Sequence, residues 1–370
     1  MLHRREILFS SIGAGIAALG GVSAAAPASG PIRATLKQDL GAGESVAGRV
    51  AVVIDDGGAR MVAFGSSGVP GLALNGDTVF EIGSITKVLT ALMFVDMAAR
   101  GEVAPDDPVA KYLPPSMTLQ ERGRPITLLD LATYTSGLPN MPSNMGPKWW
   151  TNPNPFADYT PDKLYEFLSS YAPSYEPGTH YQYANLGFGL LGLALSHRAG
   201  KSYEELLVER VCTPLGLNHT RITLSGDMQR HLAQGHDFDL KPAPLWDIPA
   251  LPGMGAVRST AKDMTVVLKV CMGIKQTPLN AGFKKLLETR RHTSLAGTDV
   301  GLGWFISSDQ TDEVAWKSGL TGGFASGIAF STRRRHGVLV LANGGGGVVG
   351  LTMNLFNPDF HPNISDSLMR

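Results

Sequence analysis

The segment FEIGSITKVLTALMFVDMAARG, residues 80–101, most constrains what this chain can fold into. At helical spacing its apolar residues cover nearly the whole circumference, and one face alone carries Ile85, Val88, Leu89, Leu92 and Met93. A helix that is apolar all round belongs in the interior of a domain. Gly101 is a typical residue to end it. The sequence therefore predicts a buried central helix.

One cation lies inside this apolar helix: Lys87, three residues after Ser84. Residues at this spacing share a helical face, so the lysine amine can reach the serine hydroxyl at the helix start. Burial disfavours the charged form of lysine, which would let Lys87 accept a proton from Ser84. The pair predicts an activated serine nucleophile. The structural alternative is that Ser84 caps the helix and Lys87 extends to solvent.

The N-terminal residues have the pattern of an export signal. Arg4 and Arg5 precede a mostly apolar run ending in small residues, and we expect cleavage after Ala24 or Ala28. The arginine pair is typical of a twin-arginine signal and equally fits a general secretion signal. We expect residues 1–28 to be a signal peptide, leaving a periplasmic or secreted protein with no membrane span. An uncleaved anchor is disfavoured by the many glycines and the short apolar run.

Charge and cysteine content limit the possible partners. Lys plus Arg equal Asp plus Glu at 32 each, and no basic run suggests nucleic-acid binding. Cys212 and Cys271 are the only cysteines, too few for a disulfide scaffold, and they either pair or remain free thiols. We expect a monomer that binds a small molecule and no nucleic acid.

Strand-like segments lie at both ends of the mature chain, with a long helical section between them. The strands are expected over residues 49–54, 59–64, 314–318, 327–330 and 337–342. Helical segments are expected over 109–112, 126–135, 161–168, 186–197, 282–289 and 349–355, with capping boxes at Ser202/Glu205 and Thr260/Asp263. We expect one domain over 33–360, with a sheet lobe (about 33–78 and 300–360) and an inserted helical lobe (about 79–299).

Residues 140–160 form a long irregular insert rich in proline and asparagine, and it contains Trp149 and Trp150. Long loops in compact domains are often functional. The alternative is a surface flap without a role.

Two further motifs carry chemistry that matches Ser84 and Lys87. Tyr183 and Asn185 lie two residues apart before a helix, and Lys317-Ser318-Gly319 ends a strand. A tyrosine near two lysines would have a lowered pKa and could take the serine proton. Asn185 can hold an amide, and Lys317 with Ser318 can bind a carboxylate.

Backbone groups complete this predicted site. Gly319 permits close approach of substrate to the strand edge, and the N–H groups of Ser84 and Leu320 are candidate oxyanion donors. Taken singly, each motif also has a structural explanation, such as a helix cap or a solvated charge. His231, His236, Asp237 and Asp239 match no metal-binding spacing, and we interpret them as a polar loop.

The ordered set S-x-x-K, Y-x-N and K-[TS]-G resembles the penicillin-recognising serine hydrolases, in the class C β-lactamase and low-molecular-mass DD-peptidase branch. The segments ITLLDLATYTSGLP (126–139), GMGAVRSTAKDM (253–264) and GLGW (301–304) add to the resemblance. It covers nearly the whole mature chain.

The resemblance implies an α+β fold of the β-lactamase/transpeptidase type, with an antiparallel sheet flanked by helices and an inserted all-α lobe. It implies an acyl-enzyme on Ser84, Lys87 and Tyr183 as base partners, and no metal or cofactor. Substrates would be β-lactams, D-alanyl-D-alanine peptides of peptidoglycan, or both. The alternatives are a short-chain carboxylesterase and a β-lactam-binding sensor without turnover.

This sequence departs from the family pattern at Asn140-Met141, where class C enzymes usually have a glutamine. The departure concerns contacts with substrate side chains. Lys317, where esterase-like relatives often have histidine, favours substrates with a free carboxylate.

Overall fold

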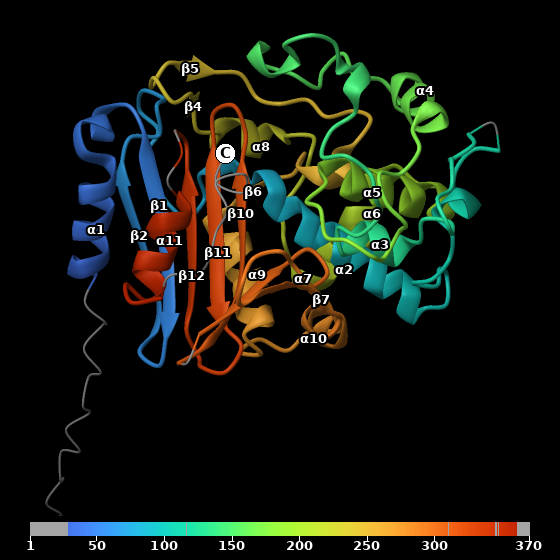
Figure 1. Ribbon diagram of the computed structural model, residues 1–370. Coiled ribbons are helices and arrows are strands. Elements are labelled where there is room, and N and C mark those ends of the chain that lie inside the picture. The colour runs from blue at the N-terminus through green and yellow to red at the C-terminus, as the bar shows by residue number, and fades with distance from the viewer. Residues whose placement is uncertain (1–28, 116, 310, 345, 347, 361–370) are drawn as a thin grey trace, which may run out of the picture.

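The computed structural model describes residues 29–360 except 116, 310, 345 and 347. The predicted signal peptide, residues 1–28, lies outside the described residues. The described part of the chain has a sheet with helices on both faces and a helical region beside it (Figure 1).

The main sheet has eight antiparallel strands in the order β2-β1-β12-β11-β10-β9-β8-β7. Their bounds are β1 Gly48–Asp55, β2 Gly58–Gly65, β7 Arg291–His292, β8 Thr298–Val300, β9 Phe305–Ser308, β10 Glu313–Leu320, β11 Ala325–Ser331 and β12 Gly337–Ala342. The five predicted strands are confirmed as β1, β2, β10, β11 and β12. Because β1 pairs with β12, the two ends of the folded chain share one sheet, as expected. The short strands β7, β8 and β9 were not predicted, because each has too few residues to show an alternating pattern.

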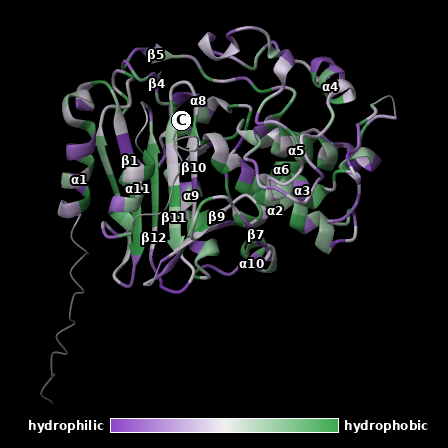
Figure 2. Cartoon of the chain, in the orientation of Figure 1, coloured by the Kyte–Doolittle hydropathy of each residue, from purple (hydrophilic) through white to green (hydrophobic). Residues whose placement is uncertain are grey.

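Helices cover both faces of this sheet. A Cβ on Gly327 of β11 would meet Thr352 of α11 (Val348–Phe356), and one on Gly337 of β12 would meet Leu268 of α9 (Ala261–Cys271). Gly337 pairs with Phe330, three residues from Gly327, so the two glycines face opposite sides of the sheet. Every residue of β11 and β12 is buried, and Figure 2 shows hydrophobic residues along them. Helix α1 (Gly30–Leu40), which was not predicted, packs against β2 and α11.

The helical region surrounds α2 (Thr86–Ala99), which is preceded by the short strand β3 (Val79–Glu81) and the 3₁₀ turn η2 (Gly83–Ile85). The predicted central helix is confirmed: most of α2 is buried, and it packs against α5 (Asn185–Ala199) and α10 (Asn280–Glu288). The remaining elements are η1 Gly41–Ser45, η3 Val109–Tyr112, α3 Leu128–Ala132, η4 Ser143–Met145, η5 Trp149–Thr151, α4 Pro161–Ser170, α6 Tyr203–Leu207, η6 Val208–Cys212, α7 Thr213–Leu215, α8 Gly226–Arg230, β4 Gly235–His236, β5 Pro242–Ala243, η7 Pro252–Met254 and β6 Arg258–Thr260.

Two local predictions were wrong in detail. The helix expected over 126–135 ends at Ala132, because Tyr134 adopts φ +58°, outside the right-handed helical region. The box at Thr260/Asp263 is half formed: Thr260 caps α9, but the Asp263 carboxylate accepts hydrogen bonds from the backbone of His219 and the hydroxyl of Thr220. The box at Ser202/Glu205 is complete.

Cys212 and Cys271 are both free thiols. Among the described helices, none has the length and apolar character needed to cross a membrane.

Candidate active site

Ser84 lies in η2, where β3 passes into α2 and where the turn packs against β10. A Cβ on Gly319 of β10 would come within 2.1 Å of the Ile82 carbonyl oxygen and 2.8 Å of the Ser84 backbone nitrogen. Gly83 has φ +47°, and a Cβ there would come within 2.7 Å of the Leu320 nitrogen. Both glycines are therefore required for this close approach. The backbone nitrogens of Ser84 and Leu320 therefore lie close to each other.

Lys87 is completely buried behind Ser84. Its Nζ lies 2.7 Å from Ser84 Oγ, 2.7 Å from Asn185 Oδ1 and 2.6 Å from the Met254 carbonyl oxygen. Neither Asn185 Oδ1 nor a carbonyl oxygen can donate a hydrogen bond. The Lys87 amine donates to these two oxygens and also lies within hydrogen-bond distance of Ser84 Oγ, from which its neutral form can accept a proton. Burial, and secondarily the charge of Lys317, lower the pKa of Lys87 well below its usual value.

These contacts rule out the structural explanation of the serine–lysine pair. Neither η2 nor α2 has a side-chain cap, so Ser84 does not cap the helix. Lys87 has no exposed surface, so it does not extend to solvent.

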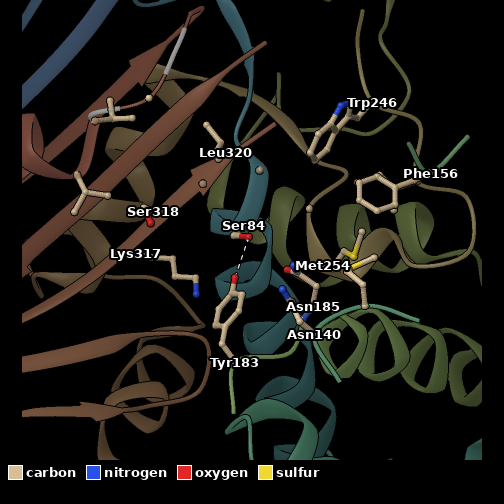
Figure 3. A pocket seen from close by; sticks show the side chains of 18 of the residues that line it. Ser84, Asn140, Phe156, Tyr183, Asn185, Trp246, Met254, Lys317, Ser318 and Leu320 are labelled. Atoms are coloured by element: carbon tan, nitrogen blue, oxygen red, sulfur yellow. Dashed lines mark hydrogen bonds between the residues drawn. The ribbon is translucent and has the colours of Figure 1, made fainter. Parts of the chain in front are cut away.

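Tyr183 donates a hydrogen bond of 3.2 Å from its hydroxyl to Ser84 Oγ, drawn in Figure 3. The prediction that nearby lysines lower its pKa was wrong. Burial raises the pKa of Tyr183 to about 12, although its hydrogen bonds with Ser84 and Tyr134 oppose this. The two lysine amines lie over the face of its ring, 5.4 Å (Lys87) and 4.8 Å (Lys317) from the ring centroid. Tyr183 is therefore a neutral phenol at physiological pH.

Lys317 and Ser318 lie where β10 continues beyond the end of its neighbour. Strand β9 pairs only with Glu313–Trp316 of β10. The residues of β10 from Lys317 to Leu320 therefore have no pairing partner in β9. Lys317 is buried, with Nζ 4.6 Å from the ring centroid of Phe305. Burial lowers the pKa of Lys317 to about 7.

Tyr134 is a site residue that the sequence did not reveal. It is fully buried, its hydroxyl accepts a hydrogen bond of 2.9 Å from Lys317 Nζ, and its ring stacks on that of Tyr183 at 4.9 Å. The segment 126–139 was recognised only as part of a family pattern. Nothing in it signals that Tyr134 takes a left-handed backbone conformation and meets a lysine on a distant strand.

Asn185 begins α5, and its backbone N–H donates to Asn140 Oδ1 at 3.1 Å. Asn140 thus ties the irregular insert to the start of this helix. Because Lys87 holds Asn185 Oδ1, the amide nitrogen of Asn185 is the group left to meet a ligand.

These segments enclose one cavity of about 260 Å³ (Figure 3). Seven of the eight predicted site residues line it: Ser84, Tyr183, Asn185, Lys317, Ser318, Gly319 and Leu320. The eighth, Lys87, lies behind Ser84. The insert contributes Asn140 and Met141, where the family resemblance had placed contacts with substrate side chains, and Trp149 and Phe156, which had not been assigned to the site. In the described part of the chain, no three His, Cys, Asp or Glu side chains are grouped so that they could hold a metal ion.

Comparisons with known proteins agree with this arrangement. The family model described as "Beta-lactamase" matches residues 33–356. The chain is 30% identical over 365 residues to the D-alanyl-D-alanine-carboxypeptidase/endopeptidase AmpH of Escherichia coli K12, covering 91% of each. It is 30% identical over 304 residues to a beta-lactamase of the same strain, covering 72% of this chain and 75% of the relative. A solved beta-lactamase/D-alanine carboxypeptidase from Yersinia pestis superimposes with a TM-score of 0.73 at 27% identity, covering 87% of this chain and 98% of that one.

Proposed function

The chain belongs to the beta-lactamase family, and we propose that this serine hydrolase forms an acyl-enzyme on Ser84 with β-lactams, D-alanyl-D-alanine peptides of peptidoglycan, or both. One observation carries the proposal. Ser84 Oγ lies between Lys87 Nζ and the Tyr183 hydroxyl, at 2.7 and 3.2 Å, in the cavity that Lys317 and Ser318 also line.

In the acylation step, Lys87 is the better base of the two partners. Burial lowers its pKa and so favours the neutral amine that can accept a proton, whereas burial raises the pKa of Tyr183 and favours the protonated phenol. Ser84 Oγ attacks the carbonyl carbon while its proton passes to Lys87 Nζ, and the C–N bond of the lactam or peptide then breaks. Tyr183 is placed to donate its proton to the leaving nitrogen, and the proton taken up by Lys87 would restore the phenol.

The substrate carbonyl would be held by backbone donors. The N–H groups of Ser84 and Leu320 are brought together where Gly83 and Gly319 meet, and together they would stabilise the negative oxygen of the tetrahedral intermediate. The free amide nitrogen of Asn185 is placed to donate to the amide carbonyl of the acyl side chain.

Lys317 and Ser318 would bind the carboxylate shared by β-lactams and D-alanyl peptides. Among the described residues, no carboxylate pairs with Lys317, so its amine is available to an incoming anion. A carboxylate accepting from both the ammonium and the Ser318 hydroxyl would gain a charge-assisted hydrogen bond.

Labelling with a fluorescent penicillin tests the assignment of Ser84. We expect a covalent adduct on the wild-type protein, a matching increase in intact mass, and neither in Ser84→Ala. A Ser318→Ala variant keeps the nucleophile and serves as a control that still acylates. Equal labelling of wild type and Ser84→Ala would remove Ser84 from the mechanism.

A substrate panel separates the proposed activity from its alternatives. Turnover of a D-Ala-D-Ala peptide or nitrocefin supports the proposal. Activity on p-nitrophenyl acetate alone would indicate a short-chain carboxylesterase. An acyl-enzyme that persists for hours would indicate a β-lactam sensor rather than a hydrolase.

We also propose that the protein is exported and acts as a monomer. The twin-arginine or general secretion pattern in residues 1–28 supports export, and the N-terminal residue of the mature protein would identify the cleavage site. All eight predicted site residues belong to this chain, so the proposed acylation needs no residue from a second copy. Analytical ultracentrifugation would contradict the monomer by finding a dimer.

A further inference from the structure

Three aromatic side chains form a wall on one side of the cavity: Trp149 and Phe156 of the insert, and Trp246, which precedes η7. Phe156 meets Trp246 edge-to-face with ring centroids 5.0 Å apart, and Trp149 lies 5.8 Å from Phe156. In Figure 3, Trp246 and Phe156 lie on the opposite side of Ser84 from Lys317 and Ser318. A substrate whose carboxylate is held by Lys317 would therefore extend its other end, the acyl side chain, toward this aromatic wall.

Trp246 is held from three directions. Its backbone N–H donates to Glu81 Oε1 at 2.8 Å, and its carbonyl oxygen accepts from Arg258 Nη2 at 2.8 Å. Glu81 and Arg258 are themselves a buried ion pair. The indole Nε1 donates to the Pro153 carbonyl oxygen at 3.0 Å. A ring fixed in this way offers a contact surface without first having to be ordered.

The insert is fastened to the same segment. Asn154 Nδ2 donates to Asp247 Oδ2 at 3.0 Å, and the Asp247 backbone N–H returns a bond of 2.9 Å to Asn154 Oδ1. The insert, which carries Trp149 and Phe156, is thus joined to the segment that carries Trp246.

None of the described residues that line this side of the cavity is charged, and Lys317 is the only Lys, Arg, Asp, Glu or His among the described lining residues. A carboxylate placed against Trp246 and Phe156 would lose water without gaining a cation among these lining residues, and it would meet the negative faces of aromatic rings. A neutral ring placed there would gain edge-to-face or stacked contacts with at least two aromatic side chains.

We infer that this site prefers acyl donors whose acyl side chain ends in a neutral aromatic ring, and that it discriminates against side chains carrying a carboxylate. The inference rests on the proposed function, because it concerns the substrate of the same acyl-enzyme. The preference belongs to the aromatic wall and not to the catalytic residues, so it can be removed without removing acylation.

Three penicillins with a common nucleus test the inference: benzylpenicillin, 6-acetamidopenicillanic acid, which lacks the ring, and carbenicillin, which adds a carboxylate beside the ring. The measured quantity is kcat/KM, or the second-order rate constant of acylation by intact mass. We expect benzylpenicillin to react about tenfold faster than the acetamido compound, as partial burial of one ring predicts, and also faster than carbenicillin.

Removal of the wall should abolish the difference. We expect Trp246→Ala to slow benzylpenicillin about tenfold and the acetamido compound less than twofold, and Trp246→Phe to retain most of the preference. Trp149→Ala repeats the test without touching the residue that Glu81 and Arg258 hold. Trp150→Ala is the matched control, since that side chain is 67% exposed and is not among the residues lining the cavity.

The results of these measurements separate the aromatic preference from the proposed function. Equal constants for the ring-bearing and ring-less penicillins, or equal losses for both in Trp246→Ala and Trp149→Ala, would overturn the aromatic preference while acylation of Ser84 stands. Failure of all three penicillins and of a D-Ala-D-Ala peptide to acylate wild-type Ser84 would overturn the proposed function, and this inference with it.

Discussion

Replacing Lys317 with methionine isolates the recognition of a substrate carboxylate. Lys317 Nζ lies over the rings of Phe305, Tyr183 and Tyr134 at 4.6, 4.8 and 5.3 Å. Methionine is an unbranched side chain of similar length that packs well against aromatic rings, so Lys317→Met keeps this packing while removing the charge. It also removes one hydrogen bond, to the Tyr134 hydroxyl.

The expected loss follows from the burial of the amine. Lys317 is 2% exposed, so a carboxylate that binds it is shielded from water and makes a charge-assisted hydrogen bond. Such bonds contribute about 1.5–3 kcal/mol, equivalent to about 10- to 150-fold in kcat/KM. A neutral ester makes no such bond. Reaction of the ester is slowed only indirectly. Loss of the Lys317 charge raises the pKa of Lys87, so less of the Lys87 amine is in the neutral form that accepts the serine proton.

The assay compares kcat/KM of wild type and Lys317→Met on benzylpenicillin, which carries a carboxylate, and on p-nitrophenyl acetate, which carries none. We expect the ratio of the two constants to fall by about 10- to 150-fold in the variant. An equal fall for both substrates would refute the reasoning, because it would show that Lys317 acts on the catalytic groups and does not bind the carboxylate.

Two further predictions follow from buried charges. Because burial lowers the pKa of Lys317 to about 7, the ammonium that binds a carboxylate is present below that pH and lost above it. The kcat/KM ratio of benzylpenicillin to p-nitrophenyl acetate should therefore fall as pH rises through about 7, and a pH-independent ratio in wild type would contradict this; Lys317→Met should show no such fall. Glu81→Gln leaves Arg258, whose side chain is 7% exposed, without its buried carboxylate, so the free energy of unfolding in urea should drop by about 3 kcal/mol. The control Glu288→Gln removes a carboxylate that is 52% exposed and should leave the unfolding midpoint unchanged, and equal midpoints for both variants would refute the role of the ion pair.

Much of the fold was predictable because its signals are local. The apolar helix after Ser84, the strand pair around the Asp-Gly turn and the C-terminal strands each have a periodicity that a short window of sequence contains. The short strands β7 to β9 and the early end of α3 were missed, because their conformations depend on neighbours across the sheet and around Tyr134.

The residues of the candidate site likewise fall into those that the sequence predicts and those that it does not. The serine–lysine spacing, the Tyr183–Asn185 pair and the Lys317 motif are visible in the sequence, since each is a short pattern of reactive side chains. Tyr134 and Trp246 were not found, because each joins the site through contacts with residues far along the chain.

The sequence by itself determined which groups are present: a hydroxyl, two amines, a phenol and an apolar helix able to bury an amine. Only the tertiary structure decided their protonation and their surroundings. It buries Tyr183 so deeply that its pKa rises where proximity to lysines alone predicted a fall, and it places the aromatic wall opposite Lys317. The physical reason is that desolvation depends on every segment packed around a group, and those segments come from all parts of the chain.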